Sequence, residues 1–155
     1  MIKILLVCTA NICRSPMAEG IFKALMATRS LDSKYGVGSA GTWGQDNLPA
    51  FPLAVETLRK RGIDISNHRS RIIKGSIIDE ANLVLTMEQN HKEALGAEFP
   101  FKKNKIFILS EMAGESFDVE DPIKKTPEDF EKTADILTAL VLDGLSKITN
   151  LGSAK

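Results

Sequence analysis

A cysteine and an arginine near the start of the chain have residue types and a spacing that suit nucleophilic chemistry on an anion. Five residues separate Cys8 from Arg14, and Ser15 follows directly. A thiolate is a good nucleophile, and a nearby guanidinium favours that form of a cysteine. The planar fork of donors on Arg14 fits two oxygens of a phosphoryl group, and the hydroxyl of Ser15 can donate to the Cys8 sulfur. The trio therefore predicts in-line phosphoryl transfer to Cys8.

The segments on either side of this loop predict the backbone that would position it. Residues 2–7 are apolar and rich in branched side chains, which is typical of a buried strand. A helix is expected from Ser15, as its N-cap, to about Ser30, with Pro16 at the first helical position. Backbone N–H groups of the loop and of the helix N-terminus can converge on one anion. We expect Cys8 to lie beneath that anion.

The rest of the chain alternates between strand-like and helix-like segments. Strands are predicted at 35–40, 83–87 and 106–109, and helices at 52–60, 88–95 and from 127 onward, with a short segment at 76–80 and Thr126 as an N-cap. This alternation implies right-handed crossovers and a parallel sheet covered by helices on both faces. We therefore predict a single α/β, Rossmann-like domain over residues 1–155. Its ligand should lie at the carboxyl end of the first strand.

Composition excludes several function classes. The 155 residues are 43% apolar, which suits one well-buried domain. Twenty basic and twenty acidic residues cancel, so no nucleic-acid or membrane partner is indicated. No run suits a signal peptide or a membrane span, and a cytoplasmic location is expected. Two cysteines and two separated histidines predict neither a structural disulfide nor a zinc site, and no metal or cofactor is expected.

The loop and several further segments resemble the low molecular weight protein tyrosine phosphatase family, of the bacterial or archaeal type near the protein arginine phosphatase branch. The family loop reads Cys-x-Gly-Asn-x-Cys-Arg-Ser-Pro, and Ala10 replaces its Gly here. The other matches follow in the family's order: residues 16–19, 39–42, His68, 81–87 and 120–122. The resemblance covers nearly the whole chain. It implies a four-stranded parallel sheet and hydrolysis of phosphotyrosine through a phosphocysteine at Cys8.

The resemblance also implies roles for individual residues. Asp121 matches the general acid that protonates the leaving oxygen and then activates water, although an Asp before a proline is by itself more often a turn residue. Arg14 binds the phosphoryl group. The phosphate-binding set is the loop itself: Thr9, Ala10, Asn11, Ile12, Cys13, Arg14 and Ser15. Inorganic phosphate, the product, is expected to occupy the same loop and inhibit.

A supporting set around Asn11 is implied in the same way. In the family, the matching Asn adopts a left-handed conformation, which Asn tolerates better than most residues. Hydrogen bonds from the residues matching Ser15, Ser39 and His68 hold it there. His91, near the start of the helix at residue 88, is expected to be a surface residue.

Substrate choice is expected to depend on the rim of the site. The thiolate would lie deep, so a long aromatic phosphoester reaches it more easily than a phosphoserine. Trp43 is a candidate wall of the entrance, or else packs against the helix at 52. Ile123 stands where family members acting on phosphotyrosine usually have Tyr or Phe, and an aliphatic side chain gives no stacking geometry.

Three alternatives to a tyrosine phosphatase remain open. Bacterial protein arginine phosphatases have a Thr where this chain has Ile12, so phosphoarginine is the second choice. Thioredoxin-coupled arsenate reductases need further cysteines downstream, and the sequence has none after Cys13. A phosphate-binding module without catalysis is opposed by the presence of Cys8, Arg14 and Asp121 together.

Cys13 is expected to protect Cys8 from oxidation. Both cysteines lie in one short loop, so their Cβ atoms can approach the roughly 3.5–4.5 Å that a disulfide requires. An accessible thiolate oxidises first to a sulfenic acid, which a neighbouring thiol can capture. The simpler alternative is that Cys13 packs beneath the loop, and the two roles are compatible.

Overall fold

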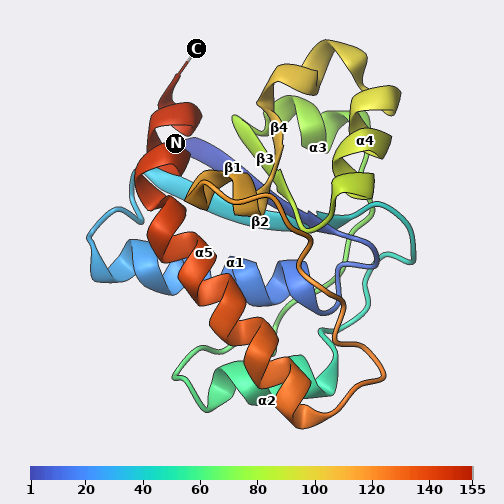
Figure 1. Ribbon diagram of the computed structural model, residues 1–155, viewed down its shortest axis with the longest axis vertical. Helices are drawn as coiled ribbons and strands as arrows, with labels where there is room; N and C mark the ends of the chain where they lie inside the picture. The colour runs from blue at the N-terminus through green and yellow to red at the C-terminus, as the bar shows by residue number, and fades with distance from the viewer. Residues whose placement is uncertain (155) are drawn as a thin grey trace.

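The computed structural model describes residues 1–154, in which helices cover both faces of a parallel sheet (Figure 1). The elements follow in the order β1 (Ile2–Cys8), α1 (Arg14–Thr28), β2 (Tyr35–Gly41), α2 (Pro52–Arg59), α3 (Gly75–Glu80), β3 (Leu83–Thr86), α4 (Gln89–Glu98), η1 (Pro100–Lys105), β4 (Ile106–Ile108), η2 (Leu109–Ala113) and α5 (Pro127–Ser153), where η marks a 3-10 helix. The predicted α/β fold class is confirmed. The predicted domain also includes Lys155, which lies outside the described residues.

Within residues 1–154, four parallel strands form one sheet in the order β2-β1-β3-β4. β1 is central, and its register pairs Cys8 with Gly41 of β2 and Val7 with Thr86 of β3. The carboxyl ends of these three strands therefore meet at one edge of the sheet. A parallel strand between two neighbours is buried on both faces, which explains the uninterrupted apolar run from Ile4 to Cys8 in β1.

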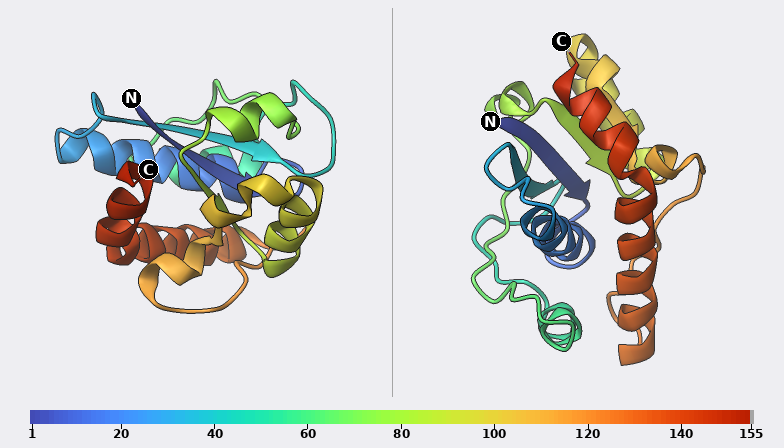
Figure 2. Two further views of the ribbon diagram at one scale, coloured as in Figure 1. Left: turned by 90° about the horizontal axis from the view of Figure 1, so that it is seen from above. Right: turned by 90° about the vertical axis from the view of Figure 1, so that its left-hand side faces the viewer.

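Two apolar clusters cover the two faces of the sheet. Alternate residues of β1 point to opposite sides, so Ile4 and Leu6 join the larger cluster with α1 and α5, whereas Leu5 and Val7 join the smaller one with α3 and α4. Figure 2 shows the two helix layers on opposite sides of the strands. The sheet is thereby a rigid platform whose edge carries the loop after β1.

α5 forms as the sequence predicts. The hydroxyl of Thr126 accepts the backbone N–H of Asp129 at 3.3 Å, and Pro127 occupies the first turn. The helix buries one apolar face, which consists of Phe130, Ala134, Leu137, Leu140, Val141 and Ile148. Leu145 lies at the margin of this face and is partly buried. This face packs over α1 and α2 and closes the larger cluster.

One local prediction is wrong. α1 begins at Arg14 with Cys13 in the N-cap position, so Ser15 lies inside the helix and does not cap it. Its hydroxyl has other partners. The segment between β4 and α5, which carries Asp121, begins with η2.

Candidate active site

The loop that joins β1 to α1 lies against the end of β2. The backbone N–H of Thr42 donates to the carbonyl of Cys8 at 3.0 Å, and that of Trp43 donates to the carbonyl of Thr9 at 2.9 Å. A Cβ atom on Gly41 would stand 2.5 Å from the carbonyl oxygen of Thr9. The loop can lie this close to β2 only because residue 41 is a glycine.

Asn11 connects the loop to its surroundings through a hydrogen-bond chain with a defined direction. Its φ is 60°, the left-handed conformation implied by the family resemblance. The backbone N–H of Arg71 donates to Oδ1 at 3.0 Å, so the amide group is oriented and Nδ2 carries the hydrogens. Nδ2 donates to Ser15 Oγ at 2.8 Å and to Ser39 Oγ at 2.9 Å. Ser15 is left with its own hydrogen for Cys8 Sγ, 3.0 Å away.

The hydrogen-bond chain branches at Asn11, and its second branch ends on a carboxylate. Ser39, which accepts from Asn11, donates its hydroxyl hydrogen to Glu19. On the other side, Nε2 of His68 donates to the backbone carbonyl of Asn11 at 2.7 Å. The structure thus brings Asn11, Ser15, Ser39 and His68 together, and it adds Glu19 and Arg71 to the set that was predicted.

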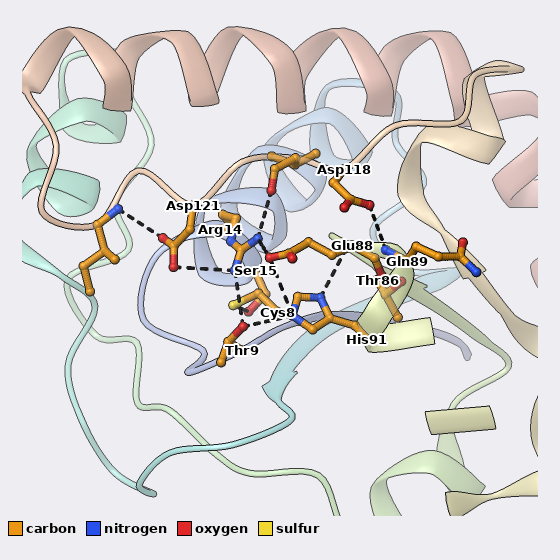
Figure 3. A network of polar contacts seen from close by, with 12 residues as sticks. Cys8, Thr9, Arg14, Ser15, Thr86, Glu88, Gln89, His91, Asp118 and Asp121 are labelled. Carbon is orange, nitrogen blue, oxygen red and sulfur yellow. Dashed lines mark hydrogen bonds and ion pairs between the residues drawn. The ribbon is translucent and has the colours of Figure 1, made fainter. Parts of the chain in front are cut away.

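Arg14 is held along one edge of its guanidinium group and is only 2% exposed. Its Nη1 atom pairs with Glu88 and donates to the carbonyl of Val119 at 2.9 Å. Its Nη2 atom lies 3.4 Å from Thr9 Oγ1 (Figure 3). Among residues 1–154 no hydrogen-bond partner of Nε is found. The edge formed by Nε and Nη2 is therefore the one that can donate to two oxygens of an anion.

Asp121 faces the same guanidinium group from the segment before α5. Its Oδ1 atom accepts the backbone N–H of Ile123 at 3.0 Å, which forms an Asx turn around Pro122. Its Oδ2 atom lies 3.6 Å from Arg14 Nη2. One carboxylate oxygen is thus used to orient the side chain, and the other is directed toward the loop.

The two cysteines and Asp121 share one small cavity. It has a volume of about 20 Å³ and is lined by Cys8, Ala10, Ile12, Cys13, Arg14, Asp121 and Ile123. Both thiols are free and buried. Burial, reinforced by the charges of Asp121 and Cys8 and opposed by that of Arg14, raises the pKa of Cys13 to about 12. Cys13 therefore remains a protonated thiol at neutral pH.

The rim differs in part from what was expected. Trp43 is 78% exposed, so the alternative in which it packs against α2 is wrong. Ile12 and Ile123 are half-buried at the edge of the cavity. Ala10 is not among the residues with positive φ, and its replacement of the family's Gly therefore introduces no backbone strain.

Sequence reasoning missed a second group of residues on the far side of the loop. Glu88 lies two residues after the end of β3, and a carboxylate at the carboxyl end of a central strand was a usable signal. His91 was expected on the surface, and this prediction is wrong: the residue is 4% exposed and contacts Thr9. Periodicity could not identify it, because a buried polar residue needs a partner that only the fold supplies.

Within residues 1–154 no helix is both long enough and apolar enough to cross a bilayer. No cluster of three or more His, Cys, Asp or Glu side chains in that range is arranged to hold a metal ion.

Comparison with known proteins agrees with this geometry. The family model for low molecular weight phosphotyrosine protein phosphatase matches residues 3–150. The probable low molecular weight protein-tyrosine-phosphatase EpsP of Ralstonia nicotianae is 38% identical over 153 residues, which cover 98% of this chain and 100% of the relative. These matches identify the protein as a phosphatase and hence a hydrolase. The chain belongs to the low molecular weight phosphotyrosine protein phosphatase family.

Solved structures show the same fold. The crystal structure of a low molecular weight protein tyrosine phosphatase from T. tengcongensis has a TM-score of 0.90 and 40% identity, and the match covers 95% of this chain and 99% of that one. A YwlE arginine phosphatase, solved as a cysteine-to-serine mutant with a phosphorylated active-site serine, has a TM-score of 0.89 and 35% identity over 96% of this chain and 95% of that one.

Proposed function

We propose that this protein hydrolyses phosphotyrosine in proteins, with Cys8 as nucleophile, Arg14 as phosphoryl ligand and Asp121 as general acid and base. The observation that carries the proposal is the convergence of three groups on one cavity. The hydroxyl of Ser15 is directed at the Cys8 sulfur, and Arg14 presents the edge formed by Nε and Nη2. Asp121 lines the same cavity and directs one oxygen toward Arg14. The backbone of residues 9–15 supplies the remaining donors.

The reaction has two balanced steps. In the first, the Cys8 thiolate attacks phosphorus, the bond from phosphorus to the phenolic oxygen breaks, and Asp121 gives its proton to that oxygen. In the second, the Asp121 carboxylate takes a proton from water as the water oxygen attacks the phosphocysteine. The sulfur–phosphorus bond then breaks, and inorganic phosphate and the Cys8 thiolate are released. Arg14 and the loop stabilise the charge on the transferring group in both steps.

Three features support a covalent intermediate and an aromatic substrate. The arginine phosphatase relative was solved with phosphate on the serine that replaces its cysteine, which is the kind of intermediate proposed for Cys8. The relative from Ralstonia nicotianae is named a probable tyrosine phosphatase. Trp43 comes just after β2, its backbone N–H is bonded to Thr9 of the loop, and its exposed ring can lie against a phenyl ring.

The mechanism is tested with p-nitrophenyl phosphate and a series of aryl and alkyl phosphates. Replacing Cys8 by Ser or Arg14 by Ala should abolish turnover, with the far-ultraviolet circular dichroism spectrum unchanged. The variant Asp121→Asn should lose most activity on substrates with poor leaving groups, because a good leaving group departs without a proton. Equal losses on alkyl and nitrophenyl esters would remove Asp121 from the acid role.

Phosphoarginine is the second candidate substrate. The family includes arginine phosphatases that resemble this chain closely, and Ile123 provides no aromatic wall opposite Trp43. Kinetics on phosphotyrosine and phosphoarginine peptides of one sequence separate the two. Replacing Ile12 by Thr should shift the ratio toward phosphoarginine by adding a polar contact at the rim. An unchanged ratio would assign specificity to Trp43 and Ile123.

Several further properties belong to the same proposal. The phosphorylated protein is the partner, inorganic phosphate inhibits by occupying the loop, and residues 1–155 act as one domain. Two free cysteines fit a reducing compartment, which supports a cytoplasmic location. Cys13 lines the same cavity as Cys8, which supports its role in capturing an oxidised Cys8 as a reversible disulfide.

A further inference from the structure

His91 is a buried histidine that the proposed mechanism does not use. It belongs to the first turn of α4, and it reaches the loop beside Thr9. Figure 3 shows its ring between the backbone of Glu88 and the side chain of Thr9. A polar ring in this position needs a partner at each nitrogen, and both partners are present.

The partners of His91 determine which nitrogen carries its proton. The backbone N–H of Glu88 lies 3.2 Å from Nδ1 and can only donate, so Nδ1 is the unprotonated acceptor. The proton is therefore on Nε2, which lies 2.9 Å from Thr9 Oγ1 and donates to it. The bond from the Glu88 N–H to Nδ1 also belongs to a capping box at the start of α4, with His91 in the place usually taken by Glu or Gln.

The direction of these bonds determines what Thr9 can do. Its oxygen accepts from His91 and also lies 3.4 Å from Arg14 Nη2, a second donor. A hydroxyl oxygen has two acceptor positions, so both are used and its hydrogen must turn elsewhere. Across residues 1–154 the hydroxyl hydrogen of Thr9 has no protein acceptor. An oxygen held by Arg14 Nη2 would lie next to it.

We propose that His91 is a positioning residue for the phosphoryl site: in its Nε2–H form it holds the Thr9 hydroxyl as a hydrogen-bond donor to the phosphoryl oxygen bound by Arg14. The proposal rests on the proposed function and deepens it. Arg71 and Glu88 then have matching roles, because a backbone N–H from each fixes the direction of one chain of hydrogen bonds. The hydrogen bonds that begin at Arg71 lead to the Cys8 sulfur, and those that begin at Glu88 lead to the phosphoryl group.

The charges around His91 agree with this form. Burial lowers the pKa of His91, and the charge of Arg14 lowers it further, while Glu88, Asp118 and Asp121 act in the opposite sense. The ring therefore stays neutral at neutral pH. Protonation would place an N–H on Nδ1 against the N–H of Glu88 and break the chain at its origin.

The test measures binding of inorganic phosphate by calorimetry, together with kcat and KM for p-nitrophenyl phosphate. The variants Thr9→Val and His91→Leu should each weaken phosphate binding roughly 10- to 100-fold, the range for a lost hydrogen bond to a charged group. The double variant should be no weaker than either single variant, because both remove the same donor. The variant Asn90→Leu, in the same turn but exposed, is the matched control and should bind phosphate like the parent.

Rescue separates positioning from packing. A Gln side chain at residue 91 can accept the N–H of Glu88 through its carbonyl and donate to Thr9 through its amide, so His91→Gln should recover the affinity that His91→Leu loses. Additive effects in the double variant, or no rescue by Gln, would overturn the proposal. If His91→Leu does not fold, the near-isosteric Thr9→Val still decides: parent-like phosphate affinity in it refutes the donor role. A parent protein that neither binds phosphate nor hydrolyses the ester would instead refute the proposed function, and this inference with it.

Discussion

Substitutions of Asn11 can separate the effect of its left-handed backbone from the effect of its side-chain hydrogen bonds. It is fully buried, its φ is 60°, and its side chain makes three hydrogen bonds, with Arg71, Ser15 and Ser39. Asn11→Ala removes all three and leaves buried polar groups unpaired, which should lower the free energy of unfolding by about 2–4 kcal/mol. A left-handed alanine adds about 1 kcal/mol more. Asn11→Gly loses the same hydrogen bonds without the backbone strain.

We therefore expect Asn11→Gly to be more stable than Asn11→Ala by roughly 1 kcal/mol in urea denaturation. Both variants should have a greatly reduced kcat for p-nitrophenyl phosphate, because Ser15 no longer has a donor that turns its hydrogen toward Cys8. Asn47 provides the matched control, since its φ is 67° and it is exposed. At residue 47 the Ala and Gly variants should differ in stability to a similar extent, with kcat unchanged.

Two results would refute this reasoning. If Asn11→Gly has the kcat of the parent protein, the left-handed backbone alone shapes the loop and the directed chain to Cys8 is irrelevant. If Asn11→Ala unfolds at the same urea concentration as the parent, the three hydrogen bonds contribute nothing to the folded state.

Three more predictions follow from single contacts. Gly41→Ala should destabilise the fold by about 1–3 kcal/mol and raise KM, because its Cβ would meet the backbone of Thr9 and only a backbone shift relieves the clash; urea denaturation and steady-state kinetics check this. The folded-state pKa of His91 is lowered below 6.5, so the unfolded chain binds the proton more tightly and the free energy of unfolding falls as the pH drops below 6.5. This loss is at most about 1.4 kcal/mol per pH unit. His91→Gln should lack it when urea denaturation is measured between pH 5 and 7. Peroxide-treated Cys13→Ser should recover less activity with dithiothreitol than the parent, and equal recovery would leave Cys13 with packing alone.

The chemistry of the loop could be predicted from the sequence because its parts are contiguous. Cys8 ends a buried strand, and Arg14 and Ser15 begin the helix that follows after a short loop, so local pattern and residue type bring them together. The alternation of apolar segments was likewise sufficient for the parallel α/β fold and for the cap of α5 at Thr126. Asp121 and His68 were identified only through the family resemblance, since each has the local sequence of an ordinary turn.

The contacts that orient Arg14 and Thr9 in the site depend on the tertiary structure. Glu88 pairs with Arg14 across 74 positions, and the carbonyl of Val119 meets the same side chain across 105. The parallel register brings the ends of β1 and β3 to one edge of the sheet. Only there does the ring of His91, which accepts the backbone N–H of Glu88, face Thr9. Local preference misjudged Ser15 and His91 for the same reason. A buried hydroxyl or imidazole forms hydrogen bonds with the groups that the fold places beside it. Some of these groups lie far away in the sequence.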